Sequence, residues 1–99
     1  SVLAALGCDI RIADSDIICD DSQLAPGYGL PNDATVVAIK YMARSEGILL
    51  DPTYSGKTFS VLLEMLRRGD FGADEHVVLL HTGGAVSLFG YPELVADDS

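Results

Sequence analysis

The sequence predicts an α/β layered fold, and three observations support this prediction. Two stretches with helical spacing of apolar residues, at 32–46 and 55–68, alternate with short apolar runs. The run from Val77 to Leu80 is unbroken, as expected of a strand buried on both faces of a parallel sheet. Gly or Pro marks most of the junctions, which makes the connections short. Such alternation is typical of helices layered on a sheet.

Length, charge and cysteine content exclude several classes of protein. The 99 residues suffice for one small domain or part of a larger one, and 48% of them are hydrophobic. The net charge of −9 disfavours nucleic acid as a partner, because phosphate binding depends on basic side chains. No apolar run approaches the roughly 20 residues that span a membrane, and no secretory signal is recognised. Cys8 and Cys19 lack metal or redox spacing, so we expect two reduced thiols in a cytoplasmic protein.

The first twenty residues predict a helix end, a strand and an acidic loop. Residues 1–7 look like the last turns of a helix that stops at Gly7 and has no start, which indicates an incomplete chain. β-Branched residues bounded by acids predict a short strand at 16–20. The acids do not form a calcium loop, because Ile18 and Cys19 occupy positions that need an oxygen ligand and a glycine.

Residues 25–31 form a predicted loop that leads into the first long helix. Tyr28 lies between two glycines, and it either serves a site or merely covers apolar surface. Asn32 is the predicted N-cap of a helix that runs to about Glu46, and Gly47 ends it.

The stretch 48–66 passes from an apolar run through a turn into the second helix. Ser55 can cap this helix, and Glu64 and Arg68 have the spacing of an ion pair. The polar turn lies where a strand meets a helix N-terminus, which is where open α/β sheets bind ligands. The apolar face of the helix comprises Phe59, Leu62, Leu63 and Leu66.

Neither a phosphate-binding P-loop nor a metal site is predicted. SGKT at 55–58 looks like the end of a P-loop, but that motif needs glycine where Asp51 stands, and Pro52 removes an amide donor. No cluster has zinc spacing, and no G-x-S-x-G elbow is present. His81 ends the predicted strand at 77–80, where a lone histidine is more often structural than a base.

Three separated motifs nevertheless resemble one family of pyridoxal-phosphate enzymes. They are GYGLP (27–31), AIKYMARSEGILLDPTYSGK (38–57) and HTGGAVSLFGY (81–91). They resemble the D-cysteine desulfhydrases and 1-aminocyclopropane-1-carboxylate deaminases. The resemblance implies a tryptophan-synthase-β-like, type II pyridoxal-phosphate fold, with a three-layer, mostly parallel sheet. Residues 1–99 would be the C-terminal portion of its large cofactor-binding domain.

The resemblance also implies the site residues. Tyr28 and Tyr54 match the active-site tyrosines of the family, which hold or protonate the substrate near the Schiff base. Ser55, Thr82 and Gly83 would contact the cofactor, with Thr82 near the pyridine nitrogen. Position 55 is Glu in the deaminases and usually Thr in the desulfhydrases, while HTGG is the desulfhydrase form of the strand-end motif.

These differences favour one reaction over another. A hydroxyl at the pyridine nitrogen can leave the ring neutral and make it a weaker electron sink. Such a sink suffices for α,β-elimination of D-cysteine to pyruvate, hydrogen sulfide and ammonia, whereas opening a cyclopropane needs more stabilisation. A 1-aminocyclopropane-1-carboxylate deaminase is the alternative within the family. A non-catalytic binding module with the same half-fold is the alternative outside it.

The resemblance further implies that part of the active site lies elsewhere. In the family, the Schiff-base lysine and the phosphate-binding loop lie upstream of the matching motifs, and nothing in this sequence matches either. Lys57 belongs to the second tyrosine motif and is not that lysine. We therefore expect this chain to be inactive without the missing N-terminal portion. With that portion, the family pattern implies a homodimer acting on a small amino acid.

Overall fold

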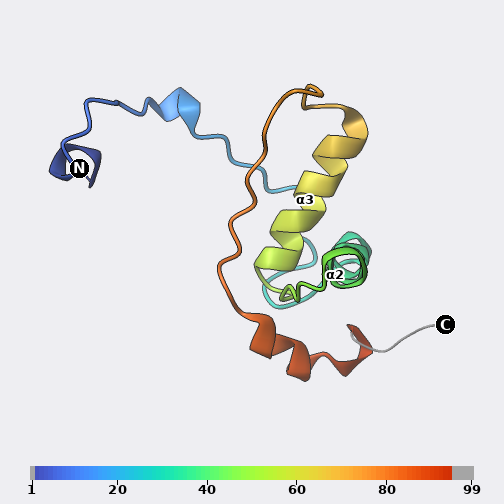
Figure 1. Ribbon diagram of the computed structural model, residues 1–99. Coiled ribbons are helices and arrows are strands. Elements are labelled where there is room, and N and C mark those ends of the chain that lie inside the picture. The colour runs from blue at the N-terminus through green and yellow to red at the C-terminus, as the bar shows by residue number, and fades with distance from the viewer. Residues whose placement is uncertain (1, 95–99) are drawn as a thin grey trace.

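The computed structural model describes residues 2–94, and two helices form its body. These are α2 (Asp33–Glu46) and α3 (Ser55–Arg68), which pack against each other (Figure 1). Residues 2–17 lead away from this body as an arm, and an extended run returns past α3 toward the C-terminal turns. The other elements are short: α1 (Val2–Ala5) and the 3₁₀ turns η1 (Asp14–Asp16), η2 (Ala85–Gly90) and η3 (Pro92–Leu94).

Helix α2 has the bounds that its end signals predict. Asn32 is the N-cap, and its Oδ1 accepts a 2.9 Å hydrogen bond from the Thr35 amide. Asp33 lies in the first turn, where the helix dipole favours an anion. The helix ends at Gly47, whose left-handed conformation few other residues adopt easily.

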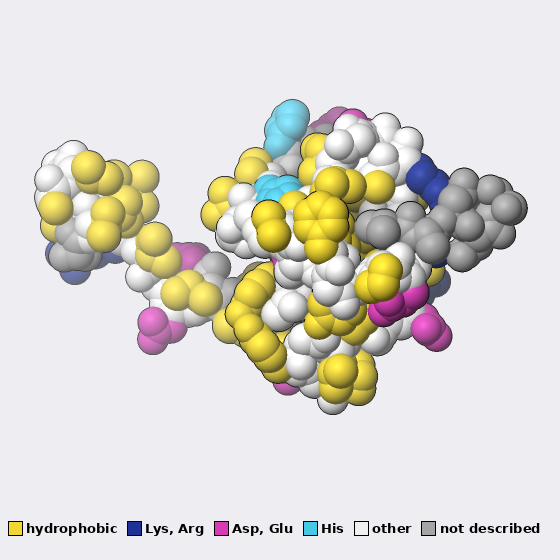
Figure 2. Space-filling view, turned by 90° about the horizontal axis from the view of Figure 1, so that it is seen from below, with side chains coloured by type: hydrophobic (Ala, Val, Ile, Leu, Met, Phe, Trp, Pro, Cys, Tyr) yellow, Lys and Arg dark blue, Asp and Glu magenta, His cyan; other side chains and the backbone are white. Residues whose placement is uncertain are grey.

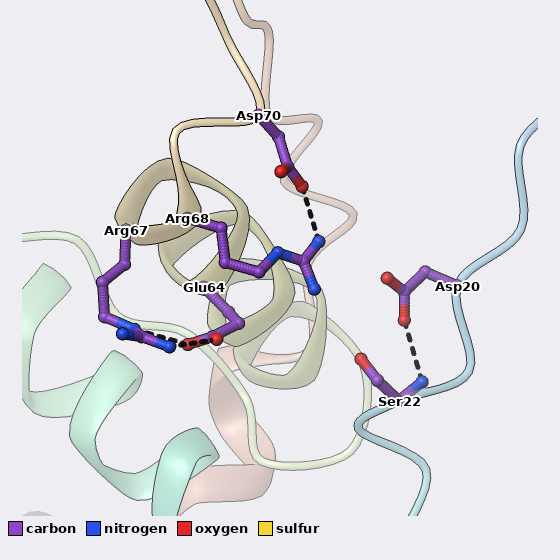
Figure 3. A network of polar contacts seen from close by, with 6 residues as sticks. All are labelled: Asp20, Ser22, Glu64, Arg67, Arg68 and Asp70. Carbon is purple, nitrogen blue, oxygen red and sulfur yellow. Dashed lines mark hydrogen bonds and ion pairs between the residues drawn. The ribbon is translucent and has the colours of Figure 1, made fainter.

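Helix α3 also matches its predicted span, but its cap and its ion pair differ from the predictions. Ser55 is the first helical residue rather than the N-cap. Glu64 pairs with Arg67 at 2.5 Å, one turn along the same face, while Arg68 turns to Asp70 at 2.5 Å (Figure 3). The aspartate just beyond the helix competes for Arg68, and the spacing within the helix could not reveal this.

The core lies between α2, α3 and the C-terminal turns. Leu50 links the two helices within it, and Leu66, at the far end of the predicted apolar face, stays half exposed. Leu62 and Leu63 pack against the core from the side. The buried apolar side chains are Ala38, Ile39, Leu50, Phe59, Leu88 and Leu94.

The predicted strands at 16–20 and 77–80 do not form in the described part of the chain. Residues 2–94 contain no strand; their one bridge, from Gly27 to Leu30, is isolated. Residues 77–79 instead line a pocket of about 370 Å³ beside α3. A β-strand needs a neighbour to take its backbone hydrogen bonds, and α3 cannot serve as one.

Apolar surface remains exposed as a result. Val78 is 89% exposed and Leu80 76%. Figure 2 shows apolar side chains over both the body and the arm. The molecule measures 52 × 30 × 27 Å with a radius of gyration of 16.0 Å, against about 13 Å for a compact domain of this length. Among residues 2–94 no helix is both long and apolar enough to cross a bilayer.

Gly56 sets the closest approach of α2 and α3. A Cβ at this position would lie 2.5 Å from the Asp51 carbonyl oxygen and 2.9 Å from Ile39 Cγ1. We expect Gly56→Ala to lower the free energy of unfolding by about 1–3 kcal/mol, since backbone must move to admit the methyl group. Urea unfolding followed by circular dichroism measures the loss. Gly90→Ala is the matched control, because a Cβ there meets nothing within 4 Å; an equal loss in both variants would contradict the packing explanation.

Candidate functional site

The turn between residues 50 and 55 is built around the Asp51 carboxylate. Asp51 is 1% exposed. Its Oδ2 accepts the amides of Thr53 and Tyr54 at 2.8 and 2.6 Å. Its Oδ1 accepts the amide and the hydroxyl of Ser55 at 2.9 and 2.6 Å. The four acceptor positions of the carboxylate are thus filled. The Ser55 amide at the start of α3 is among its donors, and the Gly56 amide donates to the Asp51 carbonyl at 2.8 Å.

These hydrogen bonds keep Asp51 charged. Burial raises the pKa of the carboxyl, but bonds from the Ser55 side chain and from the backbone amides lower the pKa by more. The net pKa lies below its ordinary value. The start of α3 therefore holds a buried, ionised carboxylate, which the helix dipole also favours.

Two exposed tyrosines meet above this turn. The hydroxyls of Tyr28 and Tyr54 are 2.7 Å apart, and their rings stand edge to face at 5.9 Å between centroids. The hydrogen bond to Tyr28 raises the pKa of Tyr54. Desolvation, repulsion by Tyr28 in its ionised form and the negative charge of Asp51 add to the increase in this pKa. Tyr54 therefore holds its proton tightly. The structure brings together the two residues that were predicted to be catalytic.

The loop that carries Tyr28 is fastened at several points. Lys57 Nζ donates to the carbonyls of Leu24 and Gly27, each at 3.1 Å. The Tyr91 hydroxyl donates to the carbonyl of Gly29. The Asn32 side chain, besides capping α2, donates to the Ala25 carbonyl at 2.8 Å. Since the loop is rich in glycine, these fastenings rather than its own backbone determine where Tyr28 lies.

The HTGG segment adjoins the same turn at two points. His81 Nε2 lies 2.8 Å from the Leu49 carbonyl oxygen, and His81 Nδ1 accepts the Gly83 amide at 3.0 Å. Because Nδ1 is an acceptor, the proton of the neutral ring is on Nε2, which donates to Leu49. Gly84 lies against Asp51, where a Cβ would come within 3.1 Å of the carboxyl carbon. This contact and a φ of +88° both favour glycine.

The predicted site residues therefore divide into two groups. Tyr28, Tyr54, Thr82 and Gly83 are all exposed. His81 and Gly84, which flank Thr82 and Gly83, contact the turn that carries Tyr54. Ser55, in contrast, is 5% exposed. Its hydroxyl donates to Asp51 Oδ1 and accepts the Asp51 amide at 2.9 Å, which leaves one lone pair unused.

Sequence reasoning missed the residues that hold the site together. Asp51 breaks the P-loop pattern and is part of the family motif, but its hydrogen bonds to the turn were not predicted, although Asp before Pro favours a turn whose amides the side chain can accept. Lys57 and Tyr91 act on backbone carbonyls far away in sequence, so no local spacing reveals their role.

A small pocket lies beside Tyr54. It has a volume of about 220 Å³ and lies between residues 20–24 and the start of α3. Ligand sites for molecules of cofactor size usually exceed about 300 Å³. Residues 2–94 hold no group of three His, Cys, Asp or Glu side chains that could bind a metal ion.

Comparison with known proteins reveals the relatives of this chain. Residues 1–83 match the family model described as pyridoxal-phosphate dependent enzyme. A 1-aminocyclopropane-1-carboxylate deaminase of Burkholderia vietnamiensis is 44% identical over 86 residues, which are 87% of this chain and 25% of that protein. A D-cysteine desulfhydrase of Salmonella typhi is 46% identical over 79 residues, which are 80% of this chain and 24% of that protein. The chain thus spans about a quarter of the length of these relatives.

The capping role of Asp51 predicts a pH-dependent stability. Because the folded-state pKa of Asp51 is depressed, its contribution is complete above the ordinary pKa of about 3.9 and is lost as pH falls through the folded value. We expect Asp51→Asn to cost about 1–2 kcal/mol at pH 7 and progressively less in acid. Thermal unfolding from pH 7 to 2 measures this difference. Asp70→Asn, which breaks an exposed pair with Arg68, is the control and should change stability little; a cost for Asp51→Asn that stays constant with pH would refute the charge-based account.

The tyrosine contact predicts a change in acidity. Removing the Tyr28 hydroxyl by Tyr28→Phe should lower the pKa of Tyr54 toward its ordinary value, because the largest cause of its elevation is gone. Carbon-13 NMR of chains labelled at tyrosine Cζ, titrated from pH 7 to 12, reads this pKa. Tyr41→Phe removes a tyrosine that stacks on Phe59 instead, and should leave Tyr54 unchanged. An unaltered Tyr54 titration in Tyr28→Phe would show that the hydroxyls do not interact in solution.

Proposed function

We propose that this chain forms one wall of the active site of a D-cysteine desulfhydrase-like lyase, because it belongs to the pyridoxal-phosphate dependent enzyme family. The reaction converts D-cysteine and water to pyruvate, hydrogen sulfide and ammonia. The observation that carries the proposal is the pair of exposed tyrosine hydroxyls, 2.7 Å apart, above the turn that Asp51 caps.

The residues present fit one end of the cofactor. Exposed hydroxyls and an aromatic edge suit a flat pyridine ring, and a Cβ on Gly83 would meet nothing within 4 Å, so backbone there can approach a ligand closely. Thr82 and Gly83 would hold the ring, and Ser55 has one lone pair to offer. The phosphate end finds no such fit, since both hydrogen bonds of Lys57 go to loop carbonyls. We propose that residues outside this chain bind the phosphate group and supply the lysine that anchors the cofactor.

The tyrosines would manage a proton beside the reacting amino acid. Bound pyridoxal phosphate supplies the electron withdrawal that lets the Cα–H bond of the amino acid break. Tyr54 keeps a proton at Oη, since its pKa is raised, and Tyr28 orients that hydroxyl. In this arrangement Tyr54 Oη would give a proton to the sulfur that leaves Cβ with its bonding electrons.

The side chains at positions 55 and 82 favour elimination over ring opening. Opening a cyclopropane needs more electron withdrawal, which a carboxylate at the pyridine nitrogen would supply by keeping that nitrogen protonated. Ser55 and Thr82 carry hydroxyls instead, and the acceptor positions of the Asp51 carboxylate are filled by the turn. The Ser55 hydroxyl proton is also committed to Asp51, which leaves Thr82 as the hydroxyl able to donate to a neutral ring nitrogen.

The remaining features of the full protein follow as parts of the same proposal. In a complete protein, residues 77–80 would become a strand of the three-layer, mostly parallel sheet in the large domain, which their exposed apolar side chains support. The free thiols of Cys8 and Cys19 support a cytoplasmic location. A homodimer rests on the resemblance alone.

A chimera tests the proposed reaction. The 79-residue stretch of the Salmonella typhi D-cysteine desulfhydrase that matches this chain is replaced by the matching residues of this chain. We expect hydrogen sulfide and pyruvate from D-cysteine and little 2-oxobutyrate from 1-aminocyclopropane-1-carboxylate. The reverse product pattern would identify a deaminase site, and a folded chimera that binds cofactor without either activity would indicate a non-catalytic module.

The same chimera tests the role of Tyr54. Tyr54→Phe should lower kcat for D-cysteine by roughly 100-fold or more, because a positioned proton donor is lost. Tyr41→Phe, on the outer face of α2, should leave kcat within about twofold, as expected of a surface change with no part in the reaction. Equal rates in the two variants would remove Tyr54 from the mechanism.

A further inference from the structure

Lys57 occupies a position that electrostatics alone does not favour. It is the third residue of α3, where the helix dipole opposes a cation, and it is only 8% exposed. Lysine is rarely buried so far without a charged partner. Within residues 2–94 no carboxylate pairs with it, and both of its hydrogen bonds go to backbone carbonyls. The energetic cost of placing Lys57 here indicates that its hydrogen bonds serve the structure elsewhere.

The two carbonyls belong to the loop that carries Tyr28. One is that of Gly27, the residue directly before Tyr28, and the other is that of Leu24. The Gly27 oxygen also accepts the Leu30 amide at 3.1 Å, so both of its lone pairs are used. The peptide group that precedes Tyr28 is thereby fixed from two sides.

The fastening by Lys57 joins two separate segments. Tyr54 lies directly before α3, and Lys57 lies three residues later in its first turn. Lys57 therefore ties the helix that follows Tyr54 to the loop that carries Tyr28. Gly27 and Gly29 on either side of Tyr28 have positive φ values of 151° and 69°, so the loop has a permissive backbone that needs such a tie.

We propose that Lys57 is a positioning residue, whose ammonium group holds the Tyr28 loop so that the two tyrosine hydroxyls remain in hydrogen-bond contact. Its importance for catalysis rests on the proposed function, but the contact itself does not. The charged groups around the tyrosine pair are Asp51 below the turn and Asp20, which lines the same pocket as Lys57 and Tyr54.

The acidity of Tyr54 reports on the contact without any reaction. Lys57→Met should lower the pKa of Tyr54 toward the value found in Tyr28→Phe, while Lys57→Arg, which keeps charge and donors, should retain most of the elevation. In the double variant Lys57→Met with Tyr28→Phe, the pKa of Tyr54 should equal that of Tyr28→Phe alone, since both changes act through one hydrogen bond. Carbon-13 NMR of the labelled 99-residue chain measures each value.

Controls separate positioning from general damage. Arg67→Met removes a cation from the exposed far end of α3 and should leave Tyr54 unchanged. Circular dichroism verifies the helix content of every variant, and Lys57→Gln replaces Lys57→Met if the latter does not fold. An unchanged pKa of Tyr54 in the folded Lys57 variant, or an additive decrease in the double variant, would overturn the proposal.

Activity distinguishes a failure of this inference from a failure of the proposed function. In the chimera, Lys57→Met should lower kcat by roughly 10- to 100-fold with little change in KM, as misplacement of a proton donor does, and Lys57→Arg should restore part of the loss. A chimera without activity while Tyr54 still responds to Lys57 would reject the lyase and keep the positioning role. An active chimera indifferent to Lys57→Met would reject the positioning role and keep the lyase.

Discussion

The buried carboxylate of Asp51 is the constraint on which the rest of the site depends. It closes the turn after Leu50, supplies the start of α3 with acceptors, and provides the surface on which Gly84 rests. An ionised group so deeply buried is tolerated only because hydrogen bonds replace the water it has lost. With its acceptor positions filled, the carboxylate has none left for a ligand. One side chain thus joins the turn at the start of α3 to the segment around Gly84, while the exposed polar groups above the turn are the hydroxyls of Tyr28 and Tyr54.

The apolar run at 77–80, in contrast with this turn, remains largely exposed. The two helices and the turn between them settle into a small core, because their contacts are close in sequence. A parallel sheet has no such local solution, since each strand needs a neighbour that arrives from far along a chain. Residues 77–80 are extended and apolar, yet in the described structure they lie beside α3 with Val78 exposed. The turn and the tyrosine pair are therefore formed, whereas the predicted sheet is not formed among residues 2–94.

The helices could be predicted from the sequence, whereas the long-range hydrogen bonds that hold the site together could not, for physical reasons. Helix ends depend on neighbouring residues, so Asn32 and Gly47 could be assigned from local sequence alone. The tyrosine pair came from a resemblance, because 26 residues separate its members and no periodicity connects them. The hydrogen bond from the Ser55 hydroxyl to Asp51 could not be predicted, because sequence patterns permit such a contact across one turn but do not require it.

The bond from Tyr91 to the Gly29 carbonyl spans 62 positions of the chain. It makes the glycine-rich loop sensitive to the integrity of a segment near the opposite terminus. Proteolytic trimming that removed η3 and Tyr91 would cut neither long helix, but it would take Leu94 from the core and release one anchor of the loop. Sequence variation around Tyr91 can therefore adjust the mobility of this loop, and with it the position of Tyr28, without altering either tyrosine of the pair.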